Sequence, residues 1–198
     1  MKFLLDPGHG GDAFGHYFTP GKRSPKVPPG IYEGVYNRQI CRMIEDAVPS
    51  GSAFEVLTIA PGPINIPLAS RVKFVNQCWR LEAPNIALIS IHCNALGFGK
   101  WLDAAGFTIF KPRTRTVKHD RLAQILHDEY NYFLDIKSRG IKEANFTIIR
   151  GPICPAVLLE TGFMTNKEEV EKLQRPETQK SIVTAIVTAM SKYTDFVV

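Results

Sequence analysis

The chain has 198 residues, and its 24 basic and 19 acidic side chains give a formal net charge of +5 at pH 7. A hydrophobic fraction of 44% with 22% charged residues is typical of a globular protein, and a chain of this length can bury a substantial core. This composition excludes a disordered chain, a collagen-like chain and a disulfide-stapled miniprotein. The positive charge leaves nucleic acid, a membrane surface and an acidic substrate open as partners.

The cysteines and the N-terminal residues indicate in which cellular compartment the protein is made. The four cysteines are far apart and form no CxxC pair, so we expect free thiols rather than a zinc ribbon or a disulfide framework. The apolar run before Asp6 has only three residues, whereas a secretory signal needs an apolar run of about 7–15 residues. No apolar run approaches the roughly 20 residues that span a bilayer. We expect a chain without an export signal, unless the signal has been trimmed, and without membrane insertion.

Apolar runs alternate with helix-period segments, which predicts an α/β domain. A short strand is expected at 3–5, and a loop rich in glycine, proline and basic residues follows over 10–34. A helix is expected at 37–48, then a strand at 54–59. Apolar residues at helical spacing predict a further helix at 68–80.

The second half continues the alternation. The near-continuous apolar run at 86–92 predicts a central strand that is covered on both faces. Further strands are expected at 107–110, 146–149 and 156–159, with a long helix at 119–134. The predicted strands total about six.

The C-terminal part is expected to be helical. Thr165 and Glu168 have the spacing of a capping box, which predicts that a helix starts there with Thr165 as its cap. A last helix is expected at 178–192. We find no internal repeat and no linker, so we expect one domain over 1–198 with no separate binding module.

Three titratable residues end predicted strands, where open α/β sheets place their ligand sites. They are His9 after the first strand, His92 at the end of the central strand and Glu160 at the end of the strand at 156–159. Because the ends of parallel strands converge at one edge of a sheet, these residues can share a site.

A nucleotide site is the first alternative to consider. The string Gly8-x-Gly10-x-x-Ala13 follows a strand, and Glu33 lies near the distance expected for a ribose-binding acid. That fingerprint must open a helix, and the four prolines between positions 20 and 29 forbid one. A phosphate-binding loop also fails, because arginine and not serine or threonine follows Lys22. We therefore disfavour nucleotide binding.

Each candidate also has a purely structural explanation. A strand-end histidine more often bonds a neighbouring carbonyl than a metal, and Glu33 in a loop is by default a solvated charge. Glu160 differs, because a carboxylate that ends an apolar run is desolvated and has a raised pKa unless a partner compensates. Two imidazoles and one carboxylate form a known catalytic zinc set with a position left for water. The residues offer His9, His92 and one of several acids, and the sequence pattern does not choose among the acids.

Four sequence motifs occur in order along the chain. They are Leu5-Asp6-Pro7-Gly8-His9-Gly10-Gly11, then Glu33 followed by Asn37, then Ser90-Ile91-His92-Cys93-Asn94-Ala95, and then the stretch from Pro155 to Asn166. Together they resemble the zinc-dependent N-acetylmuramoyl-L-alanine amidases of the type 3 amidase family. Residues 67–71 with Asn76, and residues 106–108, also resemble that family, so the resemblance extends over essentially the whole chain.

The resemblance implies roles for particular residues. His9, Glu33 and His92 would bind one zinc ion, and Glu160 would be the catalytic glutamate that moves a proton from water to the leaving nitrogen. Asn94 would either contact substrate or support the metal shell, or serve only the structure. The fold would be a twisted, mostly parallel sheet of six strands flanked by helices. The substrate would be peptidoglycan, cut between N-acetylmuramic acid and L-alanine of the stem peptide.

The chain also departs from the family. Cys93 stands where the family has a small alanine, and on a strand we expect it to point away from His92 and to pack. The basic loop at 10–34 is expected to form one wall of the substrate groove. Only about a dozen residues separate His92 from the next strand, so the inhibitory helix of exported cell-division amidases has no room. We expect a site that is open without an activator.

We therefore expect a monomeric phage or prophage endolysin that is made in the cytoplasm and reaches the wall after release or holin-type export. A bacterial autolysin of spore or mother-cell lysis is the alternative within the enzyme class. A non-catalytic wall-binding protein on an amidase scaffold is the alternative outside it. Peptidoglycan, and not nucleic acid, is the expected partner, and the net positive charge would attract the protein to the wall.

Overall fold

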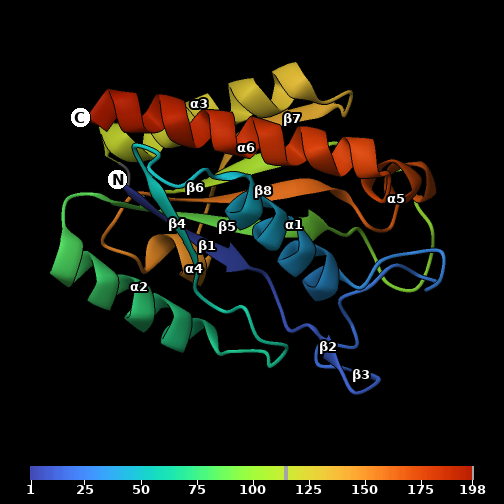
Figure 1. The fold of residues 1–198 in the computed structure, drawn as a ribbon. Coiled ribbons are helices and arrows are strands. Elements are labelled where there is room, and N and C mark those ends of the chain that lie inside the picture. The colour runs from blue at the N-terminus through green and yellow to red at the C-terminus, as the bar shows by residue number, and fades with distance from the viewer. Residues whose placement is uncertain (114–115, 198) are drawn as a thin grey trace.

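The computed structural model describes residues 1–113 and 116–197, and a six-stranded sheet crosses the molecule (Figure 1). The strands lie in the order β4-β1-β5-β8-β6-β7. Their bounds are β1 (Lys2–Pro7), β4 (Glu55–Thr58), β5 (Ile86–Asn94), β6 (Phe107–Pro112), β7 (Ser138–Ala144) and β8 (Ala156–Phe163). Neighbouring strands are parallel except β6 and β8, which are antiparallel. The prediction of a single α/β domain with a mostly parallel sheet of about six strands is confirmed.

Helices cover both faces of this sheet. Their bounds are α1 (Glu33–Ala47), α2 (Leu68–Glu82), α3 (Val117–Phe133), α4 (Thr147–Arg150), α5 (Lys167–Leu173) and α6 (Pro176–Val197). Helices α1, α3 and α6 lie over one face, and α2 and α4 lie over the other (Figure 1). In the described part of the chain, no helix is long and apolar enough to cross a bilayer.

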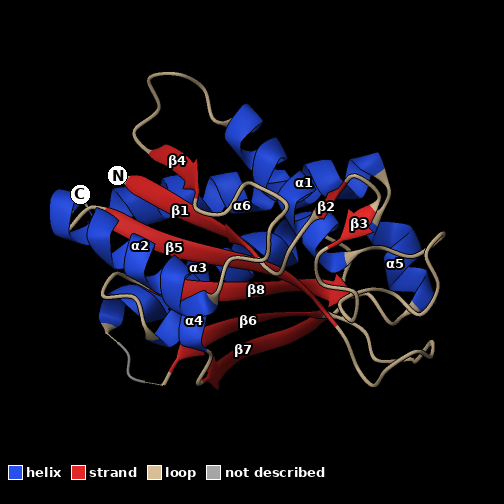
Figure 2. Ribbon diagram, turned by 90° about the horizontal axis from the view of Figure 1, so that it is seen from below, coloured by secondary structure: helices blue, strands red, loops and turns tan. Residues whose placement is uncertain are grey.

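The central strand β5 explains how the two layers are joined. Ala87, Ile89 and Ile91 are fully buried in the larger core, under α1, α3 and α6. Ile86 and Leu88 are fully buried in the smaller core, under α2 and α4. Burial on both faces is what an apolar run in a central parallel strand provides. Its neighbours β1 and β8 are both parallel to it, so the carboxyl ends of all three strands meet at one edge (Figure 2).

The prediction of a strand at 146–149 is wrong. Thr147–Arg150 forms the short helix α4, and the edge strand β7 lies just before it, at Ser138–Ala144. Ile148 and Ile149 are buried in the core beneath α2, and a short buried apolar run is equally compatible with a strand or a helix. Strand β7 pairs on one side only and is mostly solvent-accessible, so its sequence lacks an apolar pattern.

The boundaries of other helices and loops differ less from the sequence predictions. Helix α1 begins at Glu33 rather than at residue 37, so Glu33 is the first helical residue and does not lie in the preceding loop. The cap of α5 is Asn166 and not Thr165, because Asn166 Oδ1 accepts the backbone N–H of Glu169 at 3.0 Å. Within the loop at 10–34, β2 (Asp12–Ala13) and β3 (His16–Tyr17) form a small antiparallel hairpin.

Candidate metal and catalytic site

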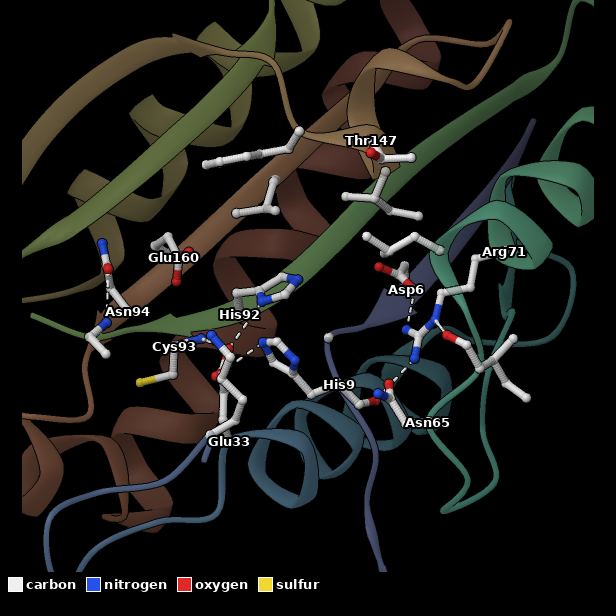
Figure 3. Close-up of a pocket in the computed structure, with 18 of the residues that line it drawn as sticks. Asp6, His9, Glu33, Asn65, Arg71, His92, Cys93, Asn94, Thr147 and Glu160 are labelled. Carbon is white, nitrogen blue, oxygen red and sulfur yellow. Dashed lines mark hydrogen bonds and ion pairs between the residues drawn. The ribbon is translucent and has the colours of Figure 1, made fainter. Parts of the chain in front are cut away.

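The fold brings together three side chains from distant parts of the chain. His9 follows β1, His92 lies near the end of β5 and Glu33 is the first residue of α1. One Glu33 oxygen lies 3.0 Å from His92 Nδ1, and the other lies 3.3 Å from His9 Nε2. One donor atom from each residue lies within 4.8 Å of the others, which suits a shared ion, and Figure 3 shows the three side chains converging. This is the metal-ligand set that the resemblance implied.

The charges of the cluster are strongly coupled. Burial by itself would raise the pKa of Glu33, but the hydrogen bonds with His9 and His92 outweigh it and hold the pKa at about 2. Burial by itself would lower the pKa of His92, whereas its hydrogen bond with Glu33 raises the pKa to about 9. The cluster therefore attracts positive charge. A divalent cation and the imidazole proton compete for it, since metal ligation needs neutral imidazole.

His9 is held in an unusual backbone conformation. Its φ of 64° lies in the left-handed region, which non-glycine residues adopt at some cost in free energy. The Arg71 guanidinium compensates, because it donates to the carbonyl of His9 at 3.1 Å and to that of Pro7 at 2.7 Å. Asn37 donates to the carbonyl of Gly8 at 3.2 Å. Two helices thus fix the turn that carries His9.

Two glycines allow this close packing. A Cβ atom at Gly8 would collide with the imidazole of His92. A Cβ atom at Gly34 would collide with the carbonyl of Gly10. Each glycine therefore lets a backbone segment approach the cluster more closely than any other residue would.

The backbone around Glu33 is tied to the loop at 10–34. The Glu33 N–H donates to the carbonyl of Lys22 at 3.0 Å. The Tyr17 hydroxyl donates to the same carbonyl at 2.7 Å and accepts the N–H of Gly34 at 3.1 Å. On the other side, the Cys93 N–H donates to Glu33 Oε1 at 3.3 Å. The sequence pattern missed this role of Tyr17, because nothing in a loop sequence shows which carbonyl a hydroxyl will reach.

Glu160 lies on β8 directly across from His92 of β5. Its Oε2 atom is buried and has no hydrogen-bond partner among the described residues. Burial is the main reason that its pKa rises to about 7, while the charge of His92 opposes the rise. A carboxyl with a pKa near neutrality is suited to accept and return a proton at physiological pH.

A cavity of about 610 Å³ opens onto these residues. Beyond the metal cluster and Glu160, its wall includes apolar side chains from the start of α2 and from α4 and β8. The wall residues that we did not single out as site residues include Lys22, Asn65, Ile66, Leu68, Arg71, Asn145, Phe146, Thr147 and Ile148. Most of them lie in loops or at helix ends, where single-sequence patterns give no signal.

Cys93 and Asn94 come directly after His92 in the sequence, and their side chains have different surroundings. Asn94 lines the cavity, and its Oδ1 accepts the N–H of Ala95 at 2.8 Å. Its role in substrate binding remains a prediction. Cys93 is buried and donates from Sγ to the carbonyl of Gly162 at 3.4 Å, away from both histidines (Figure 3). It packs as expected and does not join the metal cluster.

The protein is similar to known enzymes over its whole length. A model of the family described as N-acetylmuramoyl-L-alanine amidase matches residues 3–192. The chain belongs to this family. This amidase is 27% identical to the uncharacterized protein YqiI of Bacillus subtilis, with 96% of this chain and 84% of the relative aligned.

Two further relatives extend beyond the part that this chain matches. It is 27% identical to the N-acetylmuramoyl-L-alanine amidase CwlM of Bacillus licheniformis, over 88% of this chain and 61% of CwlM. It is 26% identical to the endolysin of Bacillus phage SPP1, over 86% of this chain and 58% of the endolysin. The chain thus spans less than two thirds of either relative. Among solved structures, an N-acetylmuramoyl-L-alanine amidase from Clostridium difficile 630 is similar, with a TM-score of 0.82, 26% identity and coverage of 98% and 96%.

Proposed function

We propose that this amidase hydrolyses the bond between the lactyl group of N-acetylmuramic acid and L-alanine of the stem peptide, with zinc as its metal. The observation that supports this most is the juxtaposition of two kinds of group in one cavity. A cluster of two imidazoles and one carboxylate lies beside Glu160, whose Oε2 atom is buried and has no hydrogen-bond partner among the described residues. Peptidoglycan is then the partner, and nucleic acid is not.

The donor set fits zinc. His9, Glu33 and His92 would supply two nitrogen atoms and one oxygen atom, which is the composition of catalytic zinc sites that keep a position open. When bound there, zinc would supply a Lewis acid for the scissile carbonyl and would acidify water. Neighbouring groups also orient the ligands, because the Cys93 N–H donates to Glu33 and the Arg71 guanidinium donates to the backbone carbonyl of His9.

Glu160 would move the proton in this reaction. Its buried Oε2 takes a proton from the attacking water, and the water oxygen forms a bond to the carbonyl carbon. The C–N bond then breaks, and Glu160 returns the proton to the alanine nitrogen. The products are a free lactyl carboxylate and a new amino terminus, so the atoms balance. Burial keeps the pKa of Glu160 at about 7, which allows both proton transfers near neutral pH.

Asn94 is the remaining predicted site residue. We propose that its amide nitrogen contacts the substrate, because the side chain lines the cavity while its oxygen is engaged with the N–H of Ala95. The basic loop at 10–34 contributes Lys22 to the same cavity and so forms part of its wall.

For the biological role, we propose a phage or prophage endolysin that acts as a monomer. The similarity to the endolysin of Bacillus phage SPP1 supports this. The connection between β5 and β6, residues 95–106, is short and contains no helix, so no helix of this connection covers the cavity. The enzyme would be made in the cytoplasm and would meet the wall after release or holin-type export. Similarity to the germination-specific amidase of Bacillus subtilis supports an autolysin as the alternative.

The products of sacculus digestion test the reaction. Purified sacculi would be incubated with the zinc-loaded protein, and the soluble products would be analysed by mass spectrometry. We expect free lactyl carboxylates on the glycan and new L-alanine amino termini on the peptides. Cleavage within the stem peptide or between sugars would overturn the assignment, and no release at all would favour a non-catalytic wall-binding protein.

The route by which the enzyme reaches the cell wall distinguishes an endolysin from an autolysin. The protein would be expressed in the cytoplasm with and without a holin of the same host. An endolysin should lyse cells only when the holin is present. Lysis that needs no holin, or cleavage restricted to spore-type peptidoglycan, would favour the autolysin.

A further inference from the structure

Apart from the two histidines of the cluster, two cationic side chains line the cavity within the described residues, and they differ in what they contact. Arg71 is 2% exposed and donates to Asp6 and to three backbone carbonyls, so its hydrogen-bonding capacity is almost exhausted. Lys22 is exposed, and its ammonium group forms no hydrogen bond or ion pair with any described residue. Lys22 is therefore the cation that is available to a ligand in this cavity.

The backbone of Lys22 is fixed beside the metal cluster. Its N–H donates to the carbonyl of Thr19 at 2.9 Å. Its carbonyl accepts from the Tyr17 hydroxyl at 2.7 Å and from the N–H of Glu33 at 3.0 Å. The ammonium also acts electrostatically on Glu160 and opposes the rise of its pKa. The charge of Lys22 therefore acts on the part of the cavity that holds Glu33 and Glu160.

Part of the wall consists of neutral polar side chains. Asn65 lies between β4 and α2, and Asn145 and Thr147 lie at the start of α4. Figure 3 shows Asn65 and Thr147 on the opposite side of the two histidines from Glu160. Amide and hydroxyl groups there are flanked by the partly exposed apolar side chains of Leu68 and Phe146. The exposed ammonium of Lys22 thus acts on the end of the cavity that holds Glu33 and Glu160. At the end with Asn65 and Thr147, the charges of Arg71 and Asp6 neutralise each other in a buried ion pair.

The substrate has the same asymmetry about the scissile amide. The glycan side consists of neutral N-acetylated sugars, whose hydroxyl and acetamido groups suit amide side chains and apolar surfaces. The peptide side contains carboxylates, on the second residue and at the peptide terminus. We propose that Lys22 binds a carboxylate of the stem peptide, so that the peptide extends toward Lys22 and the glycan lies along the neutral wall. This inference rests on the proposed amidase reaction.

The expected strength of the contact between Lys22 and the carboxylate depends on its exposure to solvent. An ammonium–carboxylate hydrogen bond is stronger than a neutral one, but an exposed pair is weakened by water and by salt. We therefore expect a preference of about five- to tenfold for a substrate with the carboxylate over one without it. The contact forms in ground state and transition state alike, so it should change KM and leave kcat nearly constant.

Four synthetic muramyl tripeptides test the proposal and identify the carboxylate. They combine D-isoglutamate or D-isoglutamine as second residue with a free or an amidated peptide terminus. Each is used with the wild-type protein, with Lys22→Gln and with Lys26→Gln, which removes an exposed lysine of the same loop that does not line the cavity. Cleavage by the zinc-loaded protein gives kcat and KM, and calorimetric titration of the metal-free protein gives binding without turnover.

The expected result is that the wild-type protein prefers one of the two carboxylates by about five- to tenfold in KM and in affinity. Lys22→Gln should lose this preference, and Lys26→Gln should keep it. Retention of the preference in Lys22→Gln, or no preference in the wild type, overturns the inference. If no tripeptide is cleaved, the proposed reaction fails, but the calorimetric comparison still decides whether Lys22 binds the carboxylate.

Discussion

Arg71 and Asp6 form a buried ion pair, 2.6 Å from Nη1 to Oδ1, although they are 65 positions apart in the sequence. The second oxygen of Asp6 accepts the hydroxyl of Ser90 at 2.6 Å, so β1, β5 and α2 meet at this carboxylate. The same guanidinium donates to the backbone of Pro7 and His9. The ion pair therefore helps to fix the position of His9, the first histidine of the candidate metal cluster.

Replacing Arg71 by methionine should destabilise the fold. The substitution leaves the Asp6 carboxylate, which is 1% exposed, without its cation. Breaking a buried pair in this way costs about 3–5 kcal/mol in the free energy of unfolding. Urea denaturation followed by circular dichroism measures the change. Arg80→Met is the matched control, because Arg80 is exposed on the same helix and its loss should change stability by at most about 0.5 kcal/mol.

A second substitution separates charge from geometry. Arg71→Lys keeps the positive charge but loses the planar group that reaches Asp6 and the two backbone carbonyls together. We expect partial recovery of stability with weaker zinc binding, because the turn at His9 is less firmly held. Zinc affinity equal to that of the wild type would show that Arg71 does not position His9.

Zinc should stabilise the protein through the cluster of His9, Glu33 and His92. A ligand that binds only the folded state at 100 times its Kd adds about 2.7 kcal/mol to the free energy of unfolding. Thermal unfolding with chelator and with added zinc measures this gain. His9→Ala and His92→Ala should each lose most of it. His16→Ala removes an exposed histidine outside the cluster and should keep it, so an equal loss in this variant would contradict the assignment.

Glu160→Gln should separate catalysis from metal binding. Glutamine has nearly the same shape but cannot accept the proton, and loss of a general base lowers kcat by about 10²- to 10⁴-fold. Zinc content, measured by atomic absorption, should stay at the wild-type level because Glu160 is not part of the ligand cluster. Glu168→Gln changes an exposed acid on α5 and should leave turnover unchanged. Full activity in Glu160→Gln would mean that another group is the base.

Tyr17→Phe should weaken the attachment of the loop to α1. The buried Tyr17 hydroxyl bridges the carbonyl of Lys22 and the N–H of Gly34, and loss of the bridge leaves that N–H without its acceptor. An unsatisfied buried donor costs about 1–3 kcal/mol. Urea denaturation at pH 8 measures the loss. Tyr132→Phe, which removes a hydroxyl from an exposed ring, should change stability little.

The Tyr17 effect should also depend on pH. Burial raises the pKa of Tyr17 from 10.0 to about 12, so the folded state keeps the phenolic proton where the unfolded state loses it. Its stabilising contribution is fully present below pH 10 and is lost as the pH rises from about 10 to about 12. The stability difference between the wild type and Tyr17→Phe should therefore narrow in that range. A difference that widens there would contradict the sign of the shift.

Much of the site could be predicted from the sequence. Strands β1, β5 and β8 are recognisable as apolar runs because central strands are buried on both faces. The polar residues that end them, His9, His92 and Glu160, follow from the same pattern together with the rule that parallel strands place ligands at their carboxyl ends. The family motifs then indicated Glu33 as the acid of the cluster.

The exposed and irregular parts were less predictable. Strand β7 pairs on one side and lacks an apolar pattern, while the buried Ile148 and Ile149 of α4 imitate a strand. Glu33 was expected in a loop, yet it begins α1, where Tyr17 and the Lys22 carbonyl fix the backbone around it. Such contacts depend on which segments meet in space, and local composition does not contain that information.

The sequence by itself therefore determined the α/β class, the central strands and the residue types of the cluster, because burial and strand ends leave local patterns. Only the tertiary structure decided how these residues are held and what surrounds them. The Arg71–Asp6 pair, the left-handed turn at His9 and the position of Lys22 in the cavity all join segments that are distant in sequence. Their geometry arises from packing, which no short stretch of the chain specifies.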